Sequence, residues 1–118
     1  MLWRSLGQNG AMPRITHPED NAWSSDVEAA VATFGNRGRN EIVRFLAANG
    51  PASRGDIVAA VSAGEPSVAQ HLLALEDAGV VTADVERGRR HGRAPRYSAN
   101  RDRIKELLEA HLHYLLEE

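Results

Sequence analysis

Five arginines fall within ten consecutive residues, RGRRHGRAPR at 87–96, and they are Arg87, Arg89, Arg90, Arg93 and Arg96. No acidic residue interrupts them, although the 118-residue chain has a net charge of −2. The segment carries +5, so the remaining residues together carry −7. A planar guanidinium can donate two parallel hydrogen bonds to phosphate oxygens, which a lysine ammonium cannot match. The cluster therefore indicates a phosphate-binding loop, and Gly88 and Gly92 keep that loop thin and bendable.

A solvated charged turn is the alternative interpretation of this segment. Such a turn usually mixes charges of both signs, whereas residues 87–96 carry one sign, so we favour contact with phosphates. Three arginines are expected at the tip of the loop, namely Arg89, Arg90 and Arg93. The two outer arginines have an alternative, which is an ion pair of Arg87 or Arg96 with Glu86 or Asp84.

A second group of hydrogen-bonding residues lies in residues 66–78, whose spacing predicts a helix. At about 100° per residue, Val68, Leu72 and Leu75 share an apolar stripe with Leu73 on its flank. The opposite side is small and polar, and comprises Pro66, Ser67, Gln70, His71 and Ala74. Amide, hydroxyl and imidazole groups can bond base edges, and an alanine leaves room for a thymine methyl. In an arbitrary helix the same residues would be ordinary solvated positions.

The residues around this helix carry acidic charge. Glu65, Glu76 and Asp77 are acidic, and residues 66–78 contain no Lys or Arg. Attraction to phosphates must therefore come from elsewhere in the chain. Besides the arginine loop, we expect secondary backbone contacts from Arg54, Arg37 and Arg39. Arg39 has an equal alternative, which is a structural role as a cap or in an ion pair.

The elements that position these residues follow from apolar periodicity. Helices are predicted over 25–34, 40–48, 53–62, 66–78 and 101–116, and strands over 80–86 and 96–98. The fold class is therefore mainly α with a small β-hairpin, in the order α-α-α-α-β-β-α. The short turn between the third and fourth helices makes a helix-turn-helix. The arginine segment then becomes the loop of the hairpin, which is a wing.

Capping signals set the expected helix ends. Ser25 with Glu28, and Ser53 with Asp56, have the spacing of capping boxes. Pro66 suits the first helical position, because its missing N–H would have no partner there. Residues 1–24 have no sustained period and predict a mobile N-terminal arm. Residues 25–118 are then one winged helix-turn-helix domain with a C-terminal dimerisation helix.

Three stretches together resemble a known family. They are GNRGRNEIVRFL (35–46), EPSVAQHLLALEDAGVV (65–81) and ERGRRHGRAPRYSAN (86–100), and they are similar to bacterial winged helix-turn-helix regulators of the ArsR type. The resemblance covers about residues 26–118. It implies that the helix near 66–78 enters the DNA major groove, that the hairpin is the wing, and that the terminal helix pairs two subunits. The expected function is therefore a sequence-specific, double-stranded-DNA-binding transcriptional regulator, a repressor acting as a homodimer.

The terminal helix is more apolar than a lone helix over a small core requires. One side of it carries Ile104, Leu107, Leu108, His111, Leu112 and Leu115. An exposed apolar helix face usually marks an interface, so we predict a two-fold homodimer built partly by this helix. Packing of the same residues within one subunit is the alternative.

Several function classes are disfavoured by composition. The chain has no cysteine, which excludes disulfides and thiolate metal sites. ArsR-type relatives often sense metals, but His111 and His113 project about 200° apart on a helix, so we expect neither a metal nor another cofactor. We also expect that the protein is not an enzyme, has no membrane partner and is located in the cytoplasm. The sequence does not identify an effector. The competing functions are a winged-helix protein–protein module and a plasmid or phage replication or partition accessory protein.

Overall fold

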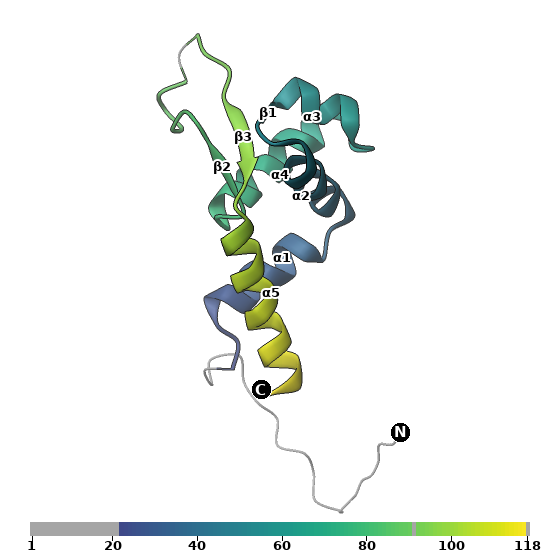
Figure 1. Ribbon diagram of the computed structural model, residues 1–118, viewed down its shortest axis with the longest axis vertical. Helices are drawn as coiled ribbons and strands as arrows, with labels where there is room; N and C mark the ends of the chain where they lie inside the picture. The colour runs from purple at the N-terminus through teal and green to yellow at the C-terminus, as the bar shows by residue number, and fades with distance from the viewer. Residues whose placement is uncertain (1–21, 91, 118) are drawn as a thin grey trace, which may run out of the picture.

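The computed structural model describes residues 22–90 and 92–117. Its elements in chain order (Figure 1) are α1 (Ser25–Phe34), α2 (Arg37–Asn49), β1 (Ala52–Ser53), α3 (Arg54–Ala60), α4 (Glu65–Asp77), β2 (Val81–Ala83), β3 (Arg96–Ala99) and α5 (Arg101–Leu116). This order confirms the predicted fold class. Most of the predicted arm, residues 1–21, lies outside the described residues. The connection between β2 and β3, residues 84–95, is named the wing below.

The sheet has one strand that the sequence pattern does not predict. The two-residue strand β1 pairs antiparallel with β3, where Ala52 faces Tyr97 and Ser53 faces Arg96. The strand order is therefore β1-β3-β2. Two residues are too few for an alternating pattern, so only the tertiary fold reveals this strand. Its consequence is that β3, and with it one end of the wing, is anchored beside the start of α3.

Three helix ends differ from their expected positions. Ser24, not Ser25, caps α1, because its Oγ accepts a hydrogen bond from the Val27 amide at 3.2 Å. Asn36 caps α2 through the Arg39 amide at 3.0 Å, so this helix begins three residues earlier than expected. Helix α3 ends at Ala60, before the expected break. At both α1 and α2, a residue whose side chain can cap a helix lies upstream of the position expected from the sequence.

The capping box at α3 is confirmed, with the Ser53 Oγ accepting from the Asp56 amide at 3.1 Å. In α4, Pro66 is the second helical residue rather than the first, since Gly64 is the cap. Proline is tolerated there because the second N–H of a helix also has no intrahelical partner. Gly79 follows α4 with φ +78°, a left-handed conformation that favours glycine.

The strand β2 is shorter than the predicted 80–86. Its ladder with β3 covers Val81–Ala83. Beyond it, the Asp84 amide donates to the Arg96 carbonyl at 3.1 Å, but the Arg96 amide donates to the Asp84 Oδ1 at 2.9 Å. An aspartate side chain thus closes the ladder where the wing begins.

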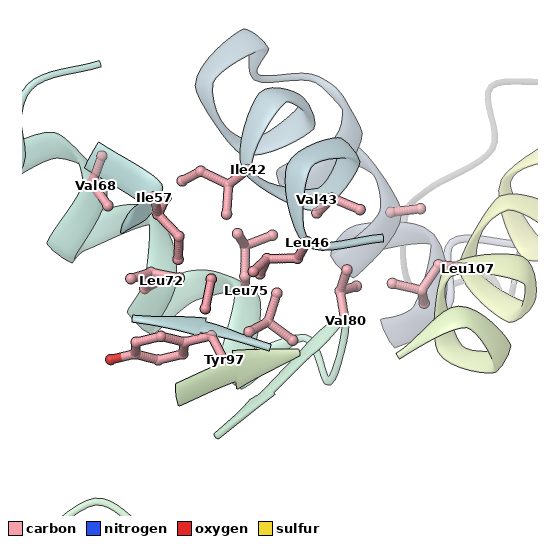
Figure 2. Close-up of a cluster of buried hydrophobic side chains, with 13 residues drawn as sticks. Ile42, Val43, Leu46, Ile57, Val68, Leu72, Leu75, Val80, Tyr97 and Leu107 are labelled. Carbon is pink, nitrogen blue, oxygen red and sulfur yellow. The ribbon is translucent and has the colours of Figure 1, made fainter. Parts of the chain in front are cut away.

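The buried core lies between α2, α3, α4 and the sheet, and continues toward α5 (Figure 2). Ile42, Ile57 and Leu75 are each 0% exposed, and burial of such a side chain contributes roughly 1.5–3 kcal/mol to folding. Leu107 of α5 joins the same cluster beside Val80 (Figure 2). Helix α1 packs along α5, on the side of the molecule away from the wing (Figure 1).

Candidate nucleic-acid interface

The turn between α3 and α4 is fixed to α2 by a carboxylate. The Glu41 Oε1 accepts hydrogen bonds from the Ser62 amide and from the Ser62 Oγ, both at 2.9 Å. The Glu41 Oε2 accepts from the Arg37 Nε at 3.1 Å. The hydrogen bonds from Ser62, and then the one from Arg37, lower the pKa of Glu41 below its ordinary value. Sequence inspection did not single out Glu41, yet it sets the geometry of the helix-turn-helix.

The inner side of α4 is the predicted stripe, since Val68, Leu72 and Leu75 are all buried. On the outer side Pro66, Ser67 and Gln70 are exposed and Ala74 is half-buried. Leu73 was expected on the flank of the packed stripe, but 46% of its surface is exposed. It lies three residues after Gln70, so the two side chains are neighbours on the helix surface. An apolar side chain is therefore added to the outward surface.

His71 does not point outward with the rest of its predicted group. Its Nδ1 accepts a hydrogen bond from the Arg39 Nε at 3.2 Å, and Arg39 also donates to the Ala32 carbonyl at 2.7 Å. The imidazole lies so close to α2 that a Cβ on Gly38 would come within 2.8 Å of its Nε2. Burial, and then the charge of Arg39, lower the pKa of His71. The Arg39–His71 pair joins α1, α2 and α4. Arg39 thus makes contacts within the fold, as in the structural role considered for it.

The other secondary arginines remain at the surface. The side chain of Arg37 is 88% exposed although it pairs with Glu41. The side chain of Arg54 is 51% exposed and lies 3.6 Å from Glu65. Exposed ion pairs of this kind contribute little, typically under about 1 kcal/mol. Both guanidinium groups can therefore exchange these partners for a phosphate at small cost.

In the wing, Arg89 and Arg93 project outward as expected. The Arg89 side chain is 82% exposed, and the Glu86 carboxylate at 3.9 Å is equally open to solvent. The Arg93 side chain is 66% exposed and pairs with Asp84 at 3.2 Å. The wing extends away from α5 (Figure 1), and Gly88 and Gly92 both have positive φ within it. His91 lies outside the described residues.

Arg90 is not at the tip, where it was expected, but folded beneath the wing. Its side chain is 21% exposed, and its Nη2 lies 3.0 Å from the Glu76 Oε1. Its Nε donates to the Val85 carbonyl at 2.9 Å, and its guanidinium stands 5.9 Å above the ring of Tyr97. Glu76 belongs to α4, so its proximity to the wing is a product of the fold that the sequence spacing does not reveal.

The outer arginines do not form the side-chain pairs that were considered for them. Arg87 pairs with Asp77 of α4 at 3.1 Å and donates to the Leu73 carbonyl at 2.9 Å. The Arg96 guanidinium donates to the Pro51 carbonyl at 2.9 Å, and only its backbone amide contacts Asp84. Through Arg87, the base of the wing adjoins the outward side of α4.

The predicted dimerisation stripe on α5 divides into an inner and an outer part. Leu107 is 0% exposed, and Ile104 packs partly buried against the same core, so packing within one subunit accounts for both. His111 is half-buried. Four leucines of this helix are between 46% and 62% exposed, and they are Leu108, Leu112, Leu115 and Leu116. Among the residues that the structure describes, nothing covers this outer apolar part of α5.

Arg103 is a structural residue that sequence inspection missed. Its Nε donates to the Ala78 carbonyl at the end of α4, at 3.0 Å. Its other nitrogens pair with Asp26 of α1 at 2.9 Å and with Glu106 at 3.1 Å. These carboxylates, Asp26 first, raise the pKa of Arg103. One guanidinium thus joins α1 and α5 to the helix-turn-helix.

Residues 36–83 match the sequence profile of the bacterial regulatory protein arsR family. They are an ArsR-family helix-turn-helix domain. The chain is similar to the crystal structure of an ArsR family transcriptional regulator, with a TM-score of 0.61 and 19% identity over 88% of this chain and 94% of that chain. It is also similar to the transcriptional repressor BigR from Xylella fastidiosa, with a TM-score of 0.56 and 19% identity over 86% and 96%. No curated protein matches in sequence.

The fold brings together part of the predicted interface. Ser67, Gln70 and the added Leu73 lie on one side of α4, while Arg89 and Arg93 lie in the adjoining wing. Within residues 22–90 and 92–117 no three histidine, aspartate or glutamate side chains gather as a metal site would require. None of the helices described is both long and apolar enough to span a bilayer.

Proposed function

We propose that this protein is a transcriptional regulator that binds a specific sequence of double-stranded DNA as a homodimer. One observation carries the proposal: the outer side of α4, which has no Lys or Arg, adjoins a wing with exposed arginines. Arg87 makes this connection, since it contacts the Leu73 carbonyl and Asp77 from the base of the wing. A helix that fits the major groove and a loop that reaches the flanking phosphates are the parts that a winged helix-turn-helix uses.

The outer side of α4 would read bases in the major groove. Gln70 can bond adenine through two groups, and Ser67 can donate or accept. The exposed Leu73, with Ala74 beside it, suits the C5-methyl of thymine. These side chains favour A·T pairs over G·C pairs, because guanine is usually read by Arg or Lys, which α4 lacks.

The phosphate contacts would come from arginines that are already exposed. They are Arg89 and Arg93 of the wing, with Arg37 and Arg54 of the helix-turn-helix. Two protomers then supply about eight contacts, so the affinity should fall about 10⁴-fold between 50 and 200 mM salt. Arg96 and Arg39 donate to backbone carbonyls and would contribute less.

The exposed leucines of α5 would form the two-fold interface. Leu112 and Leu115 are 51% and 62% exposed, and apolar surface of this extent is typically covered by a partner. Val31 of α1, 37% exposed, would extend the surface. Repression is proposed because one relative with this fold is named a repressor, and a dimer bound at a promoter blocks access to it. Such a regulator acts in the bacterial cytoplasm, on its DNA, and performs no catalysis.

Selection from a random DNA pool with the purified full chain tests this function. We expect an inverted repeat with A·T-rich half-sites, and binding to it, measured by fluorescence anisotropy, that weakens steeply with salt. Absence of any DNA binding at 50 mM salt would overturn the proposal and favour a protein–protein module. That alternative is favoured by the acidic residues that surround the wing arginines, such as Glu76 and Asp77.

A further inference from the structure

The four wing arginines occupy two different environments. Arg89 and Arg93 are more than 60% exposed, whereas Arg90 is 21% exposed and Arg87 is 43% exposed. The second pair reaches across from the wing to α4 and meets the same atom, the Glu76 Oε1, at 3.0 Å from Arg90 and 3.7 Å from Arg87.

Glu76 is unusual for an acidic residue on a helix that would face DNA. Its side chain is only 13% exposed, and within the described residues its Oε2 is buried without a hydrogen-bond partner. A buried carboxylate is unfavourable unless it is paired. The guanidinium groups of Arg90 and Arg87 pair with the Oε1 of Glu76. The carboxylate and the two wing arginines therefore stabilise each other's positions.

The remaining bonds of these arginines fix the wing relative to α4. Arg90 also donates to the Val85 carbonyl in the wing and lies over Tyr97 of β3, so it joins the wing and β3 to the helix. Arg87 donates to the Leu73 carbonyl, in the last part of α4. A loop with two positive-φ glycines would otherwise be free to move.

We propose that a clamp of Glu76, Arg90 and Arg87 positions the wing against α4. Of the four wing arginines, only Arg89 and Arg93 then contact DNA phosphates. The clamp residues are positioning residues. The proposal rests on the proposed DNA binding for its purpose, but the clamp itself can be measured without DNA.

The first experiment measures backbone order in the DNA-free protein by ¹⁵N relaxation. The variants are Glu76→Gln and Arg90→Lys, and the matched control is Glu86→Gln, which removes the same charge from an 83% exposed wing residue. We expect the order parameters of residues 85–89 to fall from about 0.85 to below about 0.6 in the first two variants. The control should not change. Equal order in all of these proteins would overturn the clamp.

The second experiment measures DNA affinity against salt concentration on the selected site. Arg89→Gln should reduce the slope of log K against log salt by about 1.8 per dimer, since each protomer loses one phosphate contact. Arg90→Gln should weaken binding about tenfold while the slope is unchanged. A slope change in Arg90→Gln equal to that in Arg89→Gln would overturn the assignment, as would a gain of affinity in Glu76→Gln beyond that of Glu86→Gln. If the wild type bound no DNA, the proposed function would fail while the relaxation experiment still decided the clamp.

Discussion

Leu73 offers a test of base reading that does not depend on charge. It is 46% exposed on the outer side of α4, in line with Gln70, so it can reach a thymine methyl when the helix enters the major groove. Replacement of thymine by uracil removes that methyl and nothing else. Loss of one buried methyl contact is worth about 0.8 kcal/mol, which is about fourfold in affinity. With two half-sites the loss becomes about fifteenfold for a dimer.

The assay is fluorescence anisotropy on the selected site, with each thymine replaced by uracil in turn in both half-sites. Wild type should lose affinity at one position per half-site, and Leu73→Ala should bind the thymine and uracil sites equally well. Gln70→Ala is the control: it should weaken binding about 1–3 kcal/mol at the preferred site and keep the sensitivity to uracil. If no position is sensitive, or if Leu73→Ala keeps the full sensitivity, the reasoning about Leu73 is wrong.

Four further predictions concern the framework and the outer side of α5. Leu107→Ala should destabilise the fold by about 2–5 kcal/mol in urea unfolding, because the residue is fully buried, whereas Leu112→Ala should leave the monomer fold intact and weaken self-association in sedimentation equilibrium. Arg103→Gln should reduce stability by about 1–3 kcal/mol through loss of its bond to the Ala78 carbonyl; a change within error would contradict its assigned role. The pKa of His71 is lowered in the folded protein, so the unfolded state binds a proton at His71 more readily than the folded state does. The contribution of neutral His71 to stability is therefore complete above pH about 6.5 and is lost as pH falls below that value. The difference in unfolding free energy between wild type and His71→Gln should therefore shrink between pH 8 and pH 5.5, and a constant difference would contradict this.

Local signals in the sequence were sufficient for most of the framework. The capping box of α3, the apolar stripe of α4 and the bounds of α5 depend on residues close together in the chain, and they appear as predicted. The short strand β1 and the role of Arg103 depend on residues brought together from distant segments. Neither has a local pattern, so neither could be found.

The wing illustrates the same limit at the candidate site. Residues 87–96 carry a single sign of charge, and that pattern predicts three arginines at the tip, Arg89, Arg90 and Arg93. The fold supplies Glu76 and Asp77 from α4, so Arg90 turns inward and Arg87 pairs across the gap. His71 was grouped with the outward residues, but it lies three residues after Val68 and four before Leu75, which is about 60° and about 40° from these buried positions on a helix. Its ring packs against α2, where Gly38 leaves space for it.

We propose that the outer side of α4 and the wing contact one duplex together. Because the chain contains no cysteine, single cysteines can carry a tethered DNA-cleaving iron chelate, with Ser67→Cys on α4 and Ala94→Cys in the wing, both at exposed positions. We expect both conjugates to cut the same selected site, with Ser67→Cys cutting inside each half-site and Ala94→Cys cutting at its flank. Cleavage by one conjugate only, or by neither while the protein remains bound, would contradict it.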